Sequence, residues 1–192
     1  MKKHFARLLV LVLLPLGVFS CKKDYDGLGP LEDSVTDIPI TVPNQEFFER
    51  FPIVTASVGR VSGTTVGPFT IVLQIPADKG KIKEITKIAT GTAGLDNLQK
   101  TADLTFNYDL TTQQTVPIAG NGTNQITFTS SLDKYTAYRN RVGPGNAGQP
   151  ALVAPNSSFT PQNPNQLPYY FLLTLEDGRQ LVSTAIRVRV VN

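Results

Sequence analysis

The C-terminal stretch YYFLLTLEDGRQLVSTAIRVRVV, residues 169–191, has an apolar residue at nearly every second position. This alternation indicates β-strands with one face in a core. Asp177 and Gly178 interrupt it, and an Asp-Gly pair favours a two-residue hairpin turn because glycine accepts positive φ angles. The facing pairs that such a turn predicts are Leu173 with Val182 and Tyr169 with Ile186. Both strands then bury the same face, so we expect an antiparallel hairpin.

The period of two continues through much of the chain before this hairpin. Apolar positions alternate with polar ones in four further segments, 53–59, 69–75, 104–110 and 126–129. Segment 81–89 differs, because its isoleucines recur every three residues, which suits either a helix face or a bulged strand. We expect a bulged strand there, since β-branched residues dominate and Gly80 and Gly91 bracket a short segment. The pattern as a whole predicts an all-β chain.

Two segments depart from the strand pattern. Residues 131–138 predict a short helix that Ser131 caps, with Leu132 and Tyr135 packed inward. Residues 140–168 hold six prolines among many Asn, Gln and Gly residues. We expect a long loop in this range, and connections longer than about 15 residues are usually either functional or disordered.

The final hairpin resembles that of bacterial immunoglobulin-like and fibronectin-like domains. The resemblance lies in YFLLTLEDGR at 170–179 and IRVRV at 186–190, and residues 69–88 are similar to the earlier hairpin of such domains. It implies an antiparallel immunoglobulin-like β-sandwich of about seven to eight strands. It implies no activity, because this architecture carries adhesins, polymer-binding modules and spacers alike.

The N-terminus has the parts of an export signal. Residues 1–7 carry three positive charges, and residues 8–19 form an apolar run that is too short to span a membrane. Cys21 follows this run, and the residues before it resemble the lipobox of bacterial lipoproteins, although Phe19 stands where small residues are usual. The lipobox positions are Val18, Phe19 and Ser20. The resemblance implies cleavage before Cys21 and acylation of its thiol, which anchors the chain to a membrane.

The residues after Cys21 bear on location. KKDYD at 22–26 resembles the export tag of surface lipoproteins of the Bacteroidota type. By analogy with enteric lipoproteins, Lys22 in place of an aspartate implies that the protein is not retained in the inner membrane. We expect a lipid-anchored outer-membrane protein on the cell surface, with the periplasmic face of that membrane as the alternative.

A tether separates this anchor from the strands. Residues 27–44 mix Gly and Pro with acidic side chains, a composition that cannot bury enough apolar area to fold alone. Asp33-Ser34-Val35 is similar to the O-glycosylation acceptors of the same bacterial group, which makes Ser34 the expected modified residue. The domain division that we predict is a signal peptide at 1–20, a lipidated N-terminus and tether at 21–50, and a β-sandwich at 51–192.

Composition excludes several kinds of chemistry. Among 192 residues the chain has one His, His4, one Cys, Cys21, and no Trp. The expected cleavage removes the His and lipidation would occupy the thiol, which excludes His-based triads, thiol proteases, Cys/His zinc sites and disulfides. Asp and Asn oxygens in loops could still bind calcium, but no Asp-rich repeat supports such a site, so we expect no metal and no cofactor. Without the signal peptide, 15 Lys and Arg balance 15 Asp and Glu, and we expect no nucleic-acid partner.

Three hypotheses of function remain. The first is a non-enzymatic interaction or structural module, held to the membrane by acyl chains, with an envelope protein or an extracellular glycan as partner. The second is a glycan-binding accessory lipoprotein of a polysaccharide-uptake system, whose aromatic contacts would be Tyr135, Tyr138 and Tyr170. The third is a hydrolase with paired carboxylates, for which the candidates are Asp109, Asp133 and Glu84. We favour the first.

Overall fold

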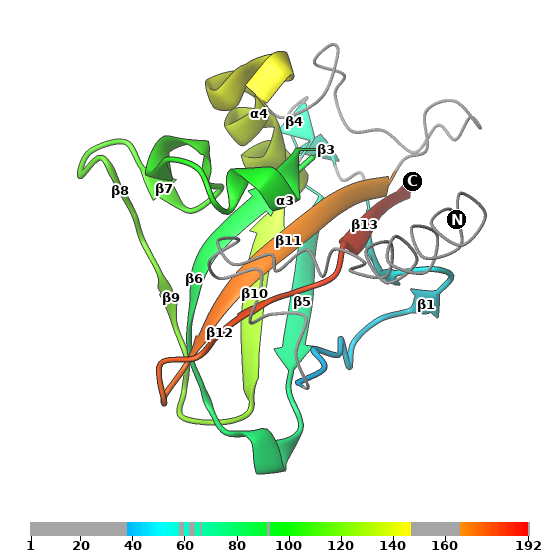
Figure 1. The fold of residues 1–192 in the computed structure, drawn as a ribbon. Coiled ribbons are helices and arrows are strands. Elements are labelled where there is room, and N and C mark those ends of the chain that lie inside the picture. Colours follow the sequence, from blue (N-terminus) through cyan, green and yellow to red (C-terminus); the bar gives the residue numbers. More distant parts are fainter. Residues whose placement is uncertain are drawn as a thin grey trace, which may run out of the picture.

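The computed structural model describes residues 38–57, 60–61, 64–65, 67–91, 93–146 and 166–191 (Figure 1). Strands dominate this part of the chain, which confirms the prediction of a mainly β fold. The larger sheet has the order β1 (Phe47–Phe48), β2 (Pro52–Ser57), β13 (Ile186–Val191), β11 (Gln166–Leu175), β6 (Ile82–Thr90) and β9 (Ile118–Ala119). A further strand, β12 (Gln180–Val182), also pairs with β11, and a second sheet pairs β5 (Pro68–Gln74) with β10 (Gln125–Ser131).

Shorter elements lie at the two ends of these strands. The 3₁₀ helix η2 (Ala77–Lys79) connects β5 to β6 at one end. The helices α3 (Gly94–Asn97) and α4 (Leu132–Asn146) lie at the other end (Figure 1). The remaining short elements are β3 (Arg60–Val61), β4 (Thr64–Thr65), η3 (Ala102–Leu104), β7 (Tyr108–Asp109) and β8 (Gln114–Thr115).

The two sheets share one hydrophobic core. Phe69 on β5 and Phe128 on β10 come from the smaller sheet, and Tyr169 and Phe171 on β11 come from the larger one; each is 4% exposed or less. The ring centroids of Phe69 and Tyr169 are 5.5 Å apart, and those of Phe128 and Phe171 are 5.4 Å apart. Edge-to-face and tilted ring pairs at such distances stabilise a core beyond the effect of area alone.

The larger sheet is mixed, which differs from the antiparallel sheet that we expected. Strand β2 pairs in parallel with β13, in a register that places Val54 opposite Val188 and Ala56 opposite Val190. Alternation reports which face of a strand is buried and carries no information on the direction of a neighbour. These two strands are also far apart in sequence, so no short connection forces them to be antiparallel.

The C-terminal hairpin has a three-residue loop, and the predicted two-residue loop is wrong. The amide of Gly178, whose φ is 90°, donates to the carbonyl of Leu175 at 3.0 Å, and the amide of Leu175 donates to the carbonyl of Arg179 at 2.9 Å. This arrangement is a turn followed by a left-handed glycine. It places Leu181, and not Val182, opposite Leu173.

The predicted pair Tyr169 with Ile186 is nevertheless present. An irregular segment between β12 and β13 restores the register. There, Phe171 and Ser183 bond twice: the Phe171 amide donates to the Ser183 hydroxyl at 3.0 Å, and the Ser183 amide donates to the Phe171 carbonyl at 2.9 Å. The core therefore receives Leu181 from β12 and Ile186 from β13.

The bulged strand predicted at 81–89 is confirmed as β6, whose pairing with β11 shifts register at two points. The strand predicted at 104–110 is mostly wrong, because only Tyr108 and Asp109 form a strand pair there. The Asp109 carboxylate accepts hydrogen bonds from the amides of Thr111 at 2.6 Å and Thr112 at 2.9 Å. This local turn ends the strand and leaves Leu110 72% exposed.

The helix predicted at 131–138 is confirmed and extends further. It begins at Leu132, and Leu132 and Tyr135 are buried in the main core. It continues to Asn146 with a break at Gly143, whose φ is 73°. The predicted loop therefore starts too early, and it ends too late because β11 begins at Gln166; residues 147–165 lie outside the described residues.

The predicted tether also ends too late. Ile38 and Val42 are 7% and 3% exposed and belong to the main core. Thr41 forms a β-bridge with Gln74. The Asn44 side chain makes two hydrogen bonds with the backbone of β5: its Nδ2 donates to the carbonyl of Thr70, and its Oδ1 accepts from the amide of Val72. The folded part therefore includes residues that the Gly, Pro and acidic composition had assigned to the tether.

Candidate functional site

The residues predicted for lipidation cannot be placed. Cys21, the lipobox residues Val18, Phe19 and Ser20, and the expected glycosylation residue Ser34 all lie outside the described residues. Within the described ranges, no helix has the length and apolarity needed to cross a membrane.

The three tyrosines predicted to contact a glycan do not form a common surface. Tyr135 and Tyr138 are 4% and 3% exposed, and burial raises the pKa of both phenols. The Tyr138 hydroxyl donates to the carbonyl of Leu104 at 3.0 Å. Tyr170 is partly buried on the opposite face of β11, against Ala89 and its neighbours. A sugar ring therefore cannot stack on Tyr135 or Tyr138 in this structure, and the glycan hypothesis loses two of the three residues on which it depended.

Helix α4 adds two arginines that the sequence did not single out. Arg139 is buried, with 2% of its surface exposed. Arg141 donates from Nη2 to the Thr105 carbonyl at 2.6 Å and from Nη1 to the Asp103 carbonyl. Its guanidinium also lies 5.1 Å from the ring centroid of Tyr108 and 5.4 Å from that of Tyr138. These contacts fasten α4 to the 102–109 segment, which is a structural role.

The candidate catalytic carboxylates lie in three separate elements and are engaged locally. Asp109 caps its own turn, and the hydrogen bonds from the amides of Thr112 and Thr111 lower its pKa. Asp133 lies in the first turn of α4, where a hydrogen bond from the Ser131 side chain lowers its pKa. Glu84 on β6 accepts a hydrogen bond from the Thr86 hydroxyl at 3.2 Å. Among the described residues, no group of three His, Cys, Asp or Glu side chains could hold a metal ion.

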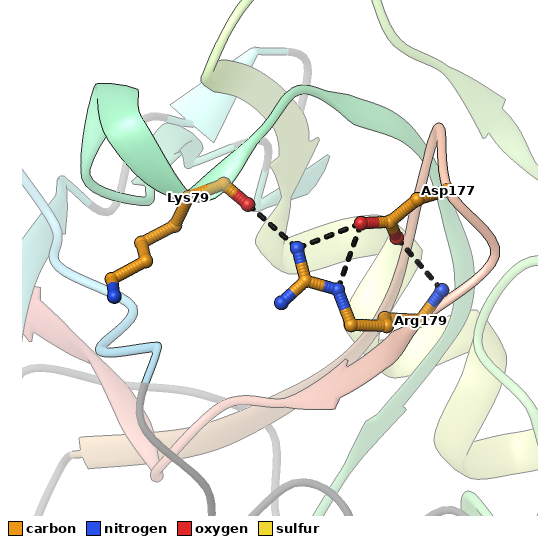
Figure 2. Close-up of polar contacts among 3 residues, drawn as sticks. All are labelled: Lys79, Asp177 and Arg179. Carbon is orange, nitrogen blue, oxygen red and sulfur yellow. Dashed lines mark hydrogen bonds and ion pairs between the residues drawn. The ribbon is translucent and has the colours of Figure 1, made fainter.

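At the η2 end of the strands, the guanidinium group of Arg179 contacts both the Asp177 carboxylate and the backbone of Lys79 (Figure 2). Its Nε donates to Oδ2 of Asp177 at 2.8 Å, and its Nη2 donates to the carbonyl of Lys79 at 2.8 Å. Figure 2 shows the Lys79 side chain directed away from this contact, so only its backbone takes part. The arginine ties the tip of the β11–β12 hairpin to the β5–β6 turn, which is again a structural function.

An exposed aromatic surface lies at β1, the edge strand of the larger sheet. Phe47 and Phe48 are 49% and 66% exposed, although phenylalanine is normally buried. We call this surface, made of Phe47, Phe48, Arg50, Phe51, Arg187 and Arg189, the aromatic–arginine edge.

The arginines of this edge lie over its rings. The Arg189 guanidinium is 5.1 Å from the ring centroid of Phe47, and the Arg187 guanidinium is 4.6 Å from that of Phe51. Arg50 is 5.7 Å from the Phe51 centroid. Arg189 also forms an ion pair with Glu49 at 2.6 Å. Cation–π contacts of this kind hold Phe47 and Phe51 together with the three arginines, and Phe48 lies next to Phe47 in β1.

The sheet explains why these residues meet. On β13, Ile186, Val188 and Val190 face the core, so Arg187 and Arg189 project from the other face. The parallel pairing with β2 brings them beside the hairpin that joins β1 to β2. The alternation predicted that these arginines face away from the core. It could not place residues 47–51 beside them, because that contact spans most of the chain and depends on the unpredicted parallel pair.

Comparisons of this chain with protein-family models, with curated proteins and with solved structures return no match. The site is therefore interpreted from its own geometry and chemistry.

Proposed function

We propose that this protein is a non-enzymatic lipoprotein of the outer membrane, whose immunoglobulin-like β-sandwich serves as an interaction module. The anchor rests on the sequence: a short apolar run, a lipobox-like approach and Cys21 as the only cysteine. The location on the cell surface rests on the resemblance of residues 22–26 to a surface export tag.

The strand order supports the immunoglobulin-like part of the proposal. In such sandwiches one sheet pairs the second strand with the fifth, and the other sheet places the third, sixth and seventh strands side by side. Here β5 pairs with β10, and β6, β11 and β13 are neighbours in the facing sheet. The first strand divides between the sheets, with Thr41 bridged to β5 and β2 paired to β13.

The chemistry of the chain supports a role without catalysis. The candidate carboxylates Asp109, Asp133 and Glu84 serve local hydrogen bonds in separate elements. The mature chain lacks histidine, and its only thiol belongs to the proposed lipid anchor.

The observation that carries the interaction role is the exposure of Phe47 and Phe48 beside three arginines. Exposed aromatic groups that are surrounded by charged side chains often mark a binding surface, since folding alone does not require them to be exposed. Aromatic and arginine side chains are also the residue types that contribute most at interfaces.

Cell fractionation combined with protease treatment of intact cells tests this proposal. We expect the wild type in the outer-membrane fraction and accessible to protease, and the Cys21→Ala variant unprocessed or released. Ser20→Ala is the matched control, because it keeps a small residue before Cys21 and should leave processing intact. A Cys21→Ala variant that fractionates and processes like the wild type would refute the anchor. A membrane-bound wild type that resists protease would move the protein to the periplasmic face.

A further inference from the structure

We propose that the aromatic–arginine edge binds the phosphate-bearing surface of the membrane leaflet that carries the lipid anchor. This inference rests on the proposed function, because it assigns a partner to the same surface. The bound orientation would lay β1 against the lipid headgroups.

The edge combines apolar rings with positive charges, the two kinds of group that bind at a membrane interface. Phe47 and Phe48, which are 49% and 66% exposed, supply apolar rings that can enter the boundary between headgroups and acyl chains. Arg189 lies over Phe47, and Arg50 and Arg187 lie over the neighbouring Phe51; these arginines would supply positive charge at the depth of the phosphates. An aromatic side chain next to a cation suits a boundary that is apolar on one side and anionic on the other.

The charges of the edge favour an anionic partner. Its three arginines outnumber the two carboxylates described beside them: Glu49 is paired with Arg189, and Glu46 accepts a hydrogen bond from Thr55, the residue opposite Arg189. The planar guanidinium group fits phosphate oxygens with two parallel hydrogen bonds, which makes arginine the preferred side chain for phosphate recognition. A guanidinium that lies over a ring still presents N–H donors at its rim.

The ring geometry favours lipid over sugar. A glycan platform needs open aromatic faces, on which a sugar ring can stack. Here guanidinium groups lie over Phe47 and Phe51, at 5.1 Å and 4.6 Å from the ring centroids, so that among the described rings of the edge a sugar would have only Phe48 on which to stack. Insertion of a ring into a lipid interface has no such requirement.

The distance along the chain from the anchor makes the contact accessible. Cys21 and Ile38, where the described chain begins, are separated by 17 residues in the sequence, which reach at most about 60 Å when fully extended. The aromatic residues of the edge, at positions 47, 48 and 51, follow Ile38 closely in the sequence. A domain held so near a bilayer meets it at a high effective concentration, so a weak contact is enough.

A single-tryptophan experiment tests the inference, because the chain has no tryptophan of its own. The full lipidated chain carrying Phe48→Trp is reconstituted into vesicles of phosphatidylethanolamine and phosphatidylglycerol, with and without bromine on the acyl chains. Leu110→Trp is the matched control, since Leu110 is 72% exposed in a different part of the fold. Phe47→Trp is a second reporter in the edge, and thermal unfolding verifies that each variant is folded.

We expect a blue shift and bromine quenching of the Phe48→Trp chain and neither for the Leu110→Trp chain. Adding Arg187→Gln and Arg189→Gln, or replacing phosphatidylglycerol with phosphatidylcholine, should reduce the quenching. Vesicle flotation reports the anchor separately. Flotation without quenching at positions 47 and 48 overturns this inference and leaves the anchor intact, whereas absence of both refutes both proposals. An emission change with dextran and none with vesicles also overturns the inference, in favour of a glycan partner.

Discussion

Two buried tyrosines differ in the hydrogen bonding of their hydroxyl groups. The Tyr138 hydroxyl donates to the Leu104 carbonyl at 3.0 Å, whereas the Tyr169 hydroxyl is buried without a hydrogen-bond partner in the described part of the chain. Leaving a polar group buried and unbonded costs about 1–3 kcal/mol, and making one hydrogen bond contributes about 1 kcal/mol. Removing the hydroxyl should therefore change the free energy of unfolding in opposite directions at the two positions.

We predict that Tyr169→Phe raises the free energy of unfolding by about 1 kcal/mol and that Tyr138→Phe lowers it by a similar amount. Urea denaturation of the two variants beside the wild type measures both changes. Each variant is the control for the other, because both changes remove one hydroxyl from a buried ring. Destabilisation by Tyr169→Phe as large as that by Tyr138→Phe would contradict the assignment.

The buried tyrosines also make the stability of the protein depend on pH in alkaline solution. Burial raises the pKa of the phenols of Tyr135 and Tyr138, and it raises that of Tyr169 well above the ordinary value. Between the pKa of about 10 in the unfolded chain and the higher values in the folded chain, the unfolded state releases protons that the folded state keeps. Stability is thus fully present below about pH 10 and falls as the pH rises further.

We predict that the buried tyrosines ionise only as the chain unfolds in alkali. Tyrosinate absorbance and far-ultraviolet circular dichroism, followed together in one titration, should give a late absorbance phase that coincides with loss of the β signal. Ionisation of all the tyrosines while the β signal is intact would show that the phenols are not buried as described.

At the scale of elements, the attachment of β9 to β6 depends on a close approach at Gly120. Its amide donates to the carbonyl of Lys83 at 2.7 Å, and a Cβ placed on Gly120 would lie 2.2 Å from the carbonyl oxygen of Ile82. Backbone atoms cannot move aside cheaply, so a side chain at this position must separate the strands.

We predict that Gly120→Ala destabilises the protein by about 2–3 kcal/mol and detaches β9. The matched control is Gly122→Ala, because Gly122 has a φ of 77° but a Cβ placed on it would meet no atom within 4 Å. That control should lose only about 1 kcal/mol, from backbone strain alone. Exchange of the amide hydrogen at position 120 should accelerate in the Gly120→Ala variant and not in the Gly122→Ala variant. Equal acceleration and equal loss of stability in the two variants would refute the close approach.

The sequence predicted the elements well where local chemistry decides them. The apolar alternation located β5, β10 and β11, the β-branched residues between Gly80 and Gly91 located β6, and Leu132 with Tyr135 located the start of α4. The errors arose where two local solutions compete. Asp177 and Gly178 suit both a two-residue turn and a three-residue loop, and Asp109 ends a strand whose apolar pattern continues to Leu110.

At the scale of the whole molecule, the contacts between distant segments escaped prediction. The parallel pairing of β2 with β13 and the burial of Ile38 and Val42 depend on neighbours far away in the sequence. The aromatic–arginine edge was missed for the same reason, since Arg189 reaches Glu49 and Phe47 across most of the chain. The anchor, by contrast, was inferred from local sequence alone.

The segment before β1 should be essential for stability. Ile38 and Val42 are buried in the core, and burial of one aliphatic side chain contributes about 1.5–3 kcal/mol. We predict that a chain beginning at Ile38 is as stable as the mature protein, whereas one beginning at Gln45 loses about 3 kcal/mol or more. Urea denaturation of the two shortened chains measures the difference. Equal stability would mean that residues 38–44 are dispensable.

The lipid that we propose on Cys21 is what would hold this domain to the outer membrane. Metabolic labelling with a palmitate analogue, followed by isolation of the protein, tests this proposal most directly. We predict that the wild type and the Ser20→Ala variant carry the label and that the Cys21→Ala variant carries none. An unlabelled wild type, or label that persists after Cys21→Ala, would contradict it.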